Sequence, residues 1–177
     1  ATAAARMRRL SEDAEIILFE KGKYISYANC GLPYYIGGVI EERERLFVQT
    51  PEAFGKRFNI DVRTESEVIA IDVVAKRVAV RTADGEEYEE SFDKLLLSPG
   101  ASPVVPPLAG IQSEGIFTLR NVSDTDRIKQ YITERRVRRA VIVGGGFIGL
   151  EMAENLKHAG AEVAVVEMAP QVMGPID

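Results

Sequence analysis

Cys30 has the side chain with the most reactive chemistry, and it is the only cysteine among 177 residues. Residues 32–40 follow it and predict a short helix, because proline is tolerated in a first helical turn. Cys30 would then lie at the helix N-terminus, where the partial positive charge favours the reactive thiolate over the thiol. The alternative is a buried cysteine acting as a small apolar side chain, and a lone cysteine does not decide between the two.

The second candidate site is the glycine-rich turn at residues 144–149, Gly-Gly-Gly-Phe-Ile-Gly. In a dinucleotide-binding unit, Gly144 permits the tight turn, Gly146 lets a pyrophosphate approach the backbone, and Gly149 allows the helix to pack closely on the strand. The alternative is an α/β unit whose glycines serve only the turn. The dinucleotide-binding interpretation depends on whether a strand precedes the turn and a helix follows it.

Those flanking elements have the pattern of a complete unit. Residues 140–143 predict a buried strand, residues 150–159 predict a helix ended by Gly160, and residues 163–166 predict a second strand. Glu167 follows that strand, where an acid hydrogen-bonds a ribose hydroxyl. The sequence therefore predicts dinucleotide binding, and the carboxylate favours NAD over the 2′-phosphate of NADP.

The start of the chain has the pattern of half of another such unit. Residues 1–10 predict a helix, residues 16–19 predict a buried strand, and Glu20 stands at the strand end, in position for a ribose hydroxyl. A solvated charge is the alternative for Glu20. The first strand of this unit and its glycine turn are not in the sequence, so we expect the chain to be a fragment.

The middle of the chain predicts a small antiparallel meander. Its three strands are predicted at residues 68–72, 77–81 and 87–92, and another apolar strand is predicted at residues 94–98. Thr50 caps a predicted short helix that ends by Asn59, and Asn121 caps another that runs to about Arg135. The proline-rich residues 99–107 mark a change of structure, and we place a domain boundary near Gly110.

The composition limits the classes of partner. The net charge of −5 argues against nucleic acid or an anionic membrane surface, and the basic residues 135–139 are interpreted as a solvated helix end. One cysteine fits a reducing compartment, and we expect a cytoplasmic protein without a signal peptide or membrane span. His158 is expected at the surface, and no cluster of residues predicts a metal site.

Residues 26–34, Ser-Tyr-Ala-Asn-Cys-Gly-Leu-Pro-Tyr, resemble the active-site segment of coenzyme A disulfide reductases. These enzymes form a single-cysteine branch of the FAD-dependent pyridine nucleotide-disulfide oxidoreductase family. Residues 50–54, 97–101 and 118–120 also resemble family positions. The resemblance implies an α/β fold with two Rossmann-like units, parallel sheets, an antiparallel meander and the three-layer FAD/NAD(P)-binding architecture. It further implies that residues 1–110 form a partial FAD-binding domain and residues 111–177 a partial NAD(P)-binding domain.

The resemblance also assigns roles to individual residues. Cys30 matches the redox nucleophile, and Arg6 stands where the family has a glutamine. The matching cofactor positions are Glu20, Lys21, Pro99, Gly100, Gly144, Gly146, Gly149 and Glu167. The positions that match coenzyme A contacts are Thr2, Arg9, Ser26 and Asn29.

The implied cofactors are FAD and NAD(P)H. Reduced nicotinamide reduces the flavin, and the flavin reduces a sulfur bond made to Cys30. With a single cysteine, the second sulfur comes from the substrate, which is coenzyme A disulfide, a coenzyme A persulfide or polysulfide. We expect a homodimer at full length and an inactive isolated chain. Two alternatives stay open: an NADH oxidase or peroxidase that uses a Cys30 sulfenic acid, and a non-catalytic nucleotide-binding fragment.

Overall fold

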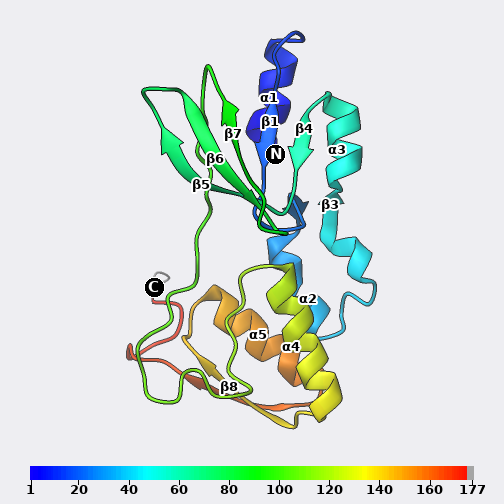
Figure 1. Ribbon diagram of the computed structural model, residues 1–177. Coiled ribbons are helices and arrows are strands. Elements are labelled where there is room, and N and C mark those ends of the chain that lie inside the picture. Colours follow the sequence, from blue (N-terminus) through cyan, green and yellow to red (C-terminus); the bar gives the residue numbers. More distant parts are fainter. Residues whose placement is uncertain (175–177) are drawn as a thin grey trace. The chain divides into compact units, whose positions relative to one another are not determined.

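The computed structural model describes residues 1–174 (Figure 1). Contacts divide the chain into two compact units. The first unit comprises Ala1–Tyr27 and Phe47–Gly100, and the second comprises Ala28–Leu46 and the residues from Ala101 onward. This division places the Cys30 segment with the later part of the chain. The assignment of residues 1–110 to FAD and residues 111–177 to NAD(P) stays a prediction.

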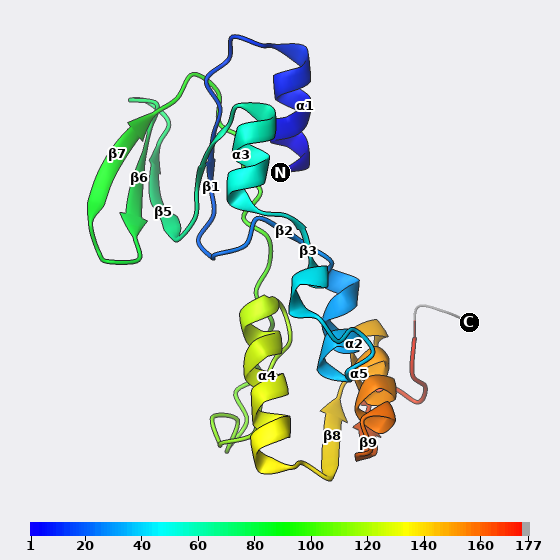
Figure 2. The ribbon, with the colours of Figure 1, turned by 90° about the vertical axis from the view of Figure 1, so that its right-hand side faces the viewer.

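The first unit begins with α1 (Thr2–Leu10), which leads to β1 (Ile17–Phe19). β1 pairs in parallel with β4 (Asp61–Arg63), and α3 (Pro51–Phe58) precedes β4. Figure 2 shows the two helices beside these strands, and their shared core consists of Ala4, Ala5, Ile16, Phe54 and Ile60. The helix and strand predicted before Glu20 are therefore confirmed.

Thr50 begins α3 as predicted, because its Oγ1 accepts a hydrogen bond of 3.2 Å from the Ala53 amide. Asn59 ends the helix with a left-handed φ of 48°. β2 (Ser26–Tyr27) pairs antiparallel with β3 (Phe47–Gln49) just before α3. β2 is the last element of the first unit before the segment that contains Cys30, and β3 is the first element after it.

The predicted meander is confirmed as β5 (Ser66–Asp72), β6 (Arg77–Thr82) and β7 (Glu87–Ser91), in that order in one antiparallel sheet. The strand predicted at residues 94–98 is wrong. The leucines at positions 95, 96 and 97 are 39%, 56% and 65% exposed, and within residues 1–174 no strand pairs with them. An apolar run forms a strand only where a neighbouring strand takes up its backbone hydrogen bonds.

The second unit contains two short 3₁₀ turns, η1 (Asn29–Gly31) and η2 (Arg43–Leu46). Cys30 is the middle residue of η1. η1 runs directly into α2 (Leu32–Ile36). The helix predicted over residues 32–40 is therefore shorter than expected. It stops at a pair of glycines, the second of which, Gly38, has a φ of +83°.

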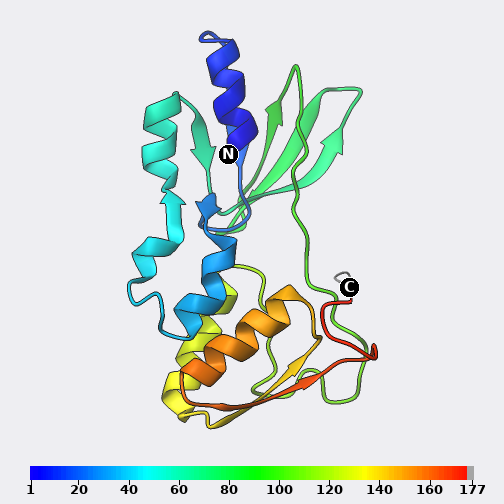
Figure 3. The ribbon, with the colours of Figure 1, turned by 180° about the vertical axis from the view of Figure 1, so that it is seen from behind.

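The rest of the second unit is an α–β–α–β sequence of α4 (Val122–Arg135), β8 (Arg139–Val143), α5 (Phe147–His158) and β9 (Glu162–Val166). β8 and β9 pair in parallel, and Figure 3 shows α5 lying along them. The predicted cap of α4 is confirmed: Asn121 Oδ1 accepts from the Asp124 amide at 2.9 Å, and the Asp124 carboxylate accepts from the Asn121 amide at 3.3 Å. α5 starts three residues earlier than predicted, directly after Gly146 and within the glycine-rich residues 144–149.

The core of the second unit packs α2, the helix after Cys30, against α4 and α5. Ile36 of α2 packs with Ile128 of α4 and with Met152 and Leu156 of α5. Through residue 174, none of the helices has the length and apolar character needed to cross a bilayer.

Candidate active site

Cys30 is exposed to solvent, so of the two interpretations left open by the sequence, the buried cysteine is wrong. Its place also differs from the predicted helix N-terminus: Cys30 lies inside η1, and Gly31 is the residue that precedes the first turn of α2. The turn is closed by a hydrogen bond of 2.9 Å from the Gly31 amide to the Ala28 carbonyl. Gly31 is buried, and an added Cβ would lie 3.2 Å from Leu46, so the backbone beside Cys30 is held against η2.

The residues assigned to coenzyme A are divided between the two units. Asn29 is exposed beside Cys30 in η1, while Ser26 is half-buried in β2 of the first unit. Thr2 and Arg9 are both exposed on α1. Because they are seven residues apart, they share one face of that helix, separated by roughly 10 Å along its axis.

The cofactor residues of the first unit follow β1. Glu20 Oε1 accepts a hydrogen bond of 2.7 Å from the Gly22 amide, and Lys21 Nζ forms an ion pair of 2.7 Å with Glu67 Oε1. Glu20 therefore stands at the carboxyl end of a parallel strand, where an acid fits a ribose hydroxyl. Pro99 and Gly100 lie beyond β7 in exposed backbone, and Gly100 has a φ of +74°.

The glycine turn of the second unit has the geometry expected of a diphosphate site. Gly144 has a φ of +106°, and a Cβ on Gly149 would lie only 2.0 Å from the Gly144 carbonyl oxygen. These two positions therefore require glycine for the turn and for close packing. Gly146 precedes α5 without a side-chain cap, and a Cβ there would meet no atom within 4 Å. The open space before a 12-residue helix fits an anionic diphosphate.

Glu167 is fixed beside this turn by two backbone amides. Its Oε1 accepts from Ala169 at 2.8 Å and its Oε2 accepts from Gly145 at 2.6 Å. These two hydrogen bonds lower the pKa of Glu167, so the carboxylate stays charged at neutral pH. The sequence predicted a role for Glu167 but none for Gly145, whose amide holds the carboxylate at the turn. The sequence did contain a signal for Gly145, because this residue lies between Gly144 and Gly146, the first two glycines of the motif.

The geometry also tests the expectation about His158. His158 is exposed at the end of α5, as predicted. Between residues 1 and 174, no group of three or more histidine, cysteine or acidic side chains is placed to hold a metal ion.

The sequence profile described as pyridine nucleotide-disulphide oxidoreductase matches residues 1–177. The chain belongs to this family. Membership confirms the α/β FAD/NAD(P)-binding fold and implies the cofactors FAD and NAD(P)H. The residues described above fit both: the glycine turn and Glu167 fit NAD(P)H, and Glu20 fits the ribose of FAD.

Several members of the family are similar over nearly the whole chain. The coenzyme A disulfide reductase of Staphylococcus haemolyticus is 43% identical over 173 residues, which are 97% of this chain and 39% of that protein. The NADH oxidase of Methanocaldococcus jannaschii is 40% identical over 172 residues, which are 97% of this chain and 38% of that protein. The crystal structure of reduced Bacillus anthracis CoADR-RHD has a TM-score of 0.96 at 58% identity, and the match covers 98% of this chain and 32% of that one. The chain thus spans about 39% of the length of the curated relatives.

Proposed function

We propose that the full-length protein is an FAD-dependent NAD(P)H oxidoreductase that reduces coenzyme A disulfide through Cys30. The observation that carries the proposal is the exposure of Cys30, the only cysteine in the chain, in the turn before α2. A solvent-accessible thiol can exchange with a disulfide, whereas a buried one is inert. The likeness to a coenzyme A disulfide reductase supports this choice of substrate.

The proposed role of Cys30 is nucleophilic. Its thiolate attacks one sulfur of coenzyme A disulfide, the substrate S–S bond breaks, and one coenzyme A leaves as a thiolate that takes up a proton. The product is a mixed disulfide between Cys30 and the second coenzyme A. When bound, the flavin supplies the two electrons, drawn from NAD(P)H, that return this disulfide to two thiols. No second cysteine in the 177 residues can displace the bound coenzyme A.

The other residues are proposed to bind rather than react. Arg9 suits the phosphates of coenzyme A through paired, charge-assisted hydrogen bonds, and Thr2 lies on the same face of α1. Ser26 and Asn29 are proposed to contact the substrate near the sulfur. The proposed cofactor contacts are those of Glu20, Lys21, Pro99 and Gly100 with FAD and of the glycine turn and Glu167 with NAD(P)H. We further propose a cytoplasmic homodimer that has no nucleic-acid partner.

The test uses the full-length flavoprotein and its Cys30→Ser variant. We expect oxidation of NAD(P)H to depend on coenzyme A disulfide in the wild type and to be abolished in the variant, while reduction of the bound flavin by NAD(P)H is retained. Mass spectrometry of the wild type treated with coenzyme A disulfide should show one coenzyme A on Cys30. A stoichiometric adduct at another residue would rule out the proposed nucleophile.

A second function is favoured by the 40% identity to an NADH oxidase. In that case, Cys30 is oxidised by peroxide to a sulfenic acid with release of water, and the exposed position of its thiol also suits this reaction. Oxygen and peroxide should then oxidise NADH faster than coenzyme A disulfide or polysulfide does. Comparing the four acceptors at equal concentration distinguishes the two functions.

A further inference from the structure

α2 lies between α4 and α5 in the second unit (Figures 2 and 3). Cys30 belongs to the turn that continues into α2 without a break. The position of the Cys30 backbone therefore depends on α2 as well as on the packing of Gly31 against η2. Since α2 is only five residues long, its own hydrogen bonds are too few to hold it in place.

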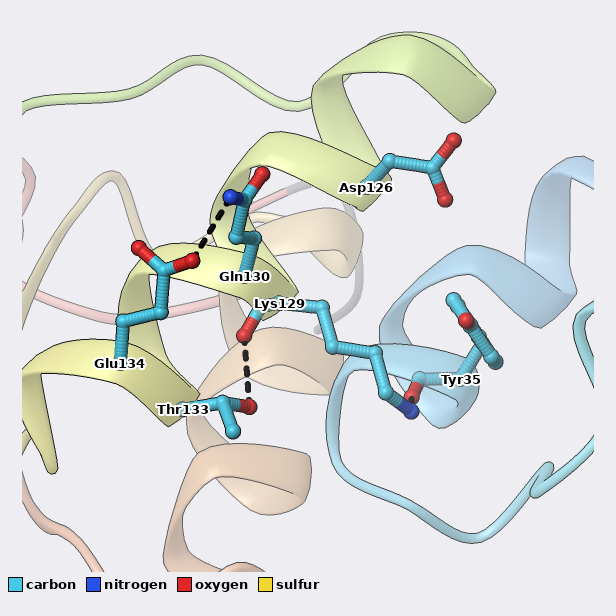
Figure 4. Close-up of a pocket in the computed structure, with 6 residues that line it drawn as sticks. All are labelled: Tyr35, Asp126, Lys129, Gln130, Thr133 and Glu134. Carbon is cyan, nitrogen blue, oxygen red and sulfur yellow. Dashed lines mark hydrogen bonds between the residues drawn. The ribbon is translucent and has the colours of Figure 1, made fainter.

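Lys129 binds the end of α2 from the neighbouring helix. Figure 4 shows its side chain reaching from α4 to Tyr35, at the rim of a pocket of about 300 Å³. Lys129 Nζ donates a hydrogen bond of 2.5 Å to the Tyr35 carbonyl oxygen and lies 3.7 Å from the centroid of the Tyr35 ring. The same carbonyl oxygen also accepts a hydrogen bond of 3.2 Å from the Gly38 amide, so Lys129 adds a second donor. The carbonyl end of a helix carries a partial negative charge that attracts a cation.

The environment of Lys129 indicates that its position is specific. Burial lowers the pKa of Lys129, so the ammonium has given up part of its hydration to make this contact. Its neighbour Gln130 points elsewhere and bonds Glu134 at 2.7 Å (Figure 4). Of these two neighbouring residues, Lys129 is the one that bonds to α2.

A second attachment follows α2 in the chain. Arg43 binds Asp126 of α4 with two parallel hydrogen bonds, Nε to Oδ1 at 2.9 Å and Nη2 to Oδ2 at 2.7 Å. The planar guanidinium matches the carboxylate in both bonds, which fixes direction as well as distance. α4 therefore makes polar contacts at Tyr35 and at Arg43, beside the packing of Ile128 on Ile36.

The opposite side of α2 is pressed against α5 at Gly37. A Cβ on Gly37 would lie 2.7 Å from both Cβ and the carbonyl oxygen of Asn155, and Asn155 is 2% exposed. Gly37 has φ and ψ of −74° and −6°, which any residue adopts, so only the close approach requires glycine. Asn155 belongs to the helix that begins at the glycine turn.

We propose that Lys129 and Gly37 are positioning residues for Cys30, which they act on by holding α2 between α4 and α5. The inference rests on the proposed role of Cys30 as the nucleophile. Displacement of α2 moves the sulfur relative to the atoms it must meet, and small displacements of a reacting group are costly in rate.

The test compares Lys129→Met, Lys129→Arg and Arg135→Met in the full-length flavoprotein. Arg135→Met is the matched control, because it removes one cation of α4, whose ion pair is with Glu114 rather than with α2. For Lys129→Met we expect amide hydrogen exchange at residues 29–38 to be about tenfold faster and kcat with coenzyme A disulfide about tenfold lower, as for loss of one charge-assisted hydrogen bond. KM should change less than twofold. Lys129→Arg should restore both values, because a guanidinium can also donate to a carbonyl and stack on a ring.

Gly37→Ala is the second variant, since its methyl group lifts α2 from α5 and leaves Lys129 unchanged. The same pattern of faster exchange and lower kcat is expected. The proposal is overturned if Lys129→Met, or Gly37→Ala where Lys129→Met is insoluble, leaves the exchange of residues 29–38 unchanged. It is equally overturned if exchange rises but kcat stays at the wild-type value. Amide exchange needs no substrate, so this readout stands even if coenzyme A disulfide is not the acceptor.

Discussion

The backbone amide of Gly145 donates a hydrogen bond of 2.6 Å to Oε2 of Glu167. This bond joins the glycine turn to the residue after β9. The strands β8 and β9 pair in parallel up to the residues just before it, where Val143 lies opposite Val166. The carboxylate is thereby fixed at the edge of the proposed nucleotide site. Its charge and orientation do not depend on the arrival of the nucleotide.

The first prediction concerns the choice of nucleotide. A carboxylate repels the 2′-phosphate of NADPH, so the wild-type full-length protein should prefer NADH. Glu167→Gln keeps the shape and removes the charge, and we expect the ratio of kcat/KM for NADH over NADPH to fall about tenfold. Glu162→Gln, at the exposed start of β9, is the control and should leave the ratio unchanged. An unchanged ratio in Glu167→Gln would show that another residue selects the nucleotide.

The second prediction concerns pH. The Ala169 and Gly145 amides lower the pKa of Glu167, so the folded protein releases this proton at a lower pH than an unfolded chain, whose glutamate pKa is about 4.3. The stabilising contribution is therefore complete above about pH 4.3 and is lost as pH falls through the lowered pKa. We expect the difference in NADH affinity between wild type and Glu167→Gln to be constant from about pH 8 to pH 5. Fluorescence titrations would contradict this if the difference vanished above pH 5.

The third prediction separates two glycines of one turn. Gly149→Ala places a Cβ against the Gly144 carbonyl oxygen, a backbone atom that cannot turn aside, so the second unit should lose about 2 kcal/mol of stability. Gly146→Ala meets no atom within 4 Å and should leave the midpoint of thermal unfolding unchanged. Its methyl group instead enters the space proposed for the diphosphate, so NADH affinity should fall. Equal effects of the two variants on unfolding would contradict this assignment.

The fourth prediction concerns Arg8, which joins α1 to α3. Its guanidinium donates to the carbonyl oxygens of Ser11, Glu12, Phe58 and Asn59, at distances between 2.5 and 3.2 Å. Arg8→Met leaves these helix-end carbonyls without their cation and should cost about 2 kcal/mol of stability.

The same variant should also raise KM for coenzyme A disulfide, because α1 carries Thr2 and Arg9. The control is Lys56→Met, which removes an exposed cation of α3. Thermal unfolding and steady-state kinetics of the two variants check both effects. A loss of stability without a change in KM would separate α1 from substrate binding.

Elements with local signals were predicted well. The caps at Thr50 and Asn121 act within three residues, and the alternating pattern of β6 decides which of its side chains face inward. The strand predicted at residues 94–98 failed for a related reason, since an apolar run carries no information about whether a partner strand lies beside it. Likewise, nothing within residues 32–40 distinguishes the five-residue helix that forms from a longer one, except the two glycines that end it.

By itself, the sequence determined the kind of chemistry: one thiol, a glycine turn between strand and helix, and an acid after the next strand. Each is a matter of residue type and short spacing. Only the tertiary structure decided that Cys30 is exposed and that Gly145 holds Glu167. It also decided that Lys129 and Asn155 meet the C-terminal end of α2, at Tyr35 and Gly37. Such contacts depend on how helices pack, because a side chain 94 residues away leaves no periodic or local trace in the segment that it touches.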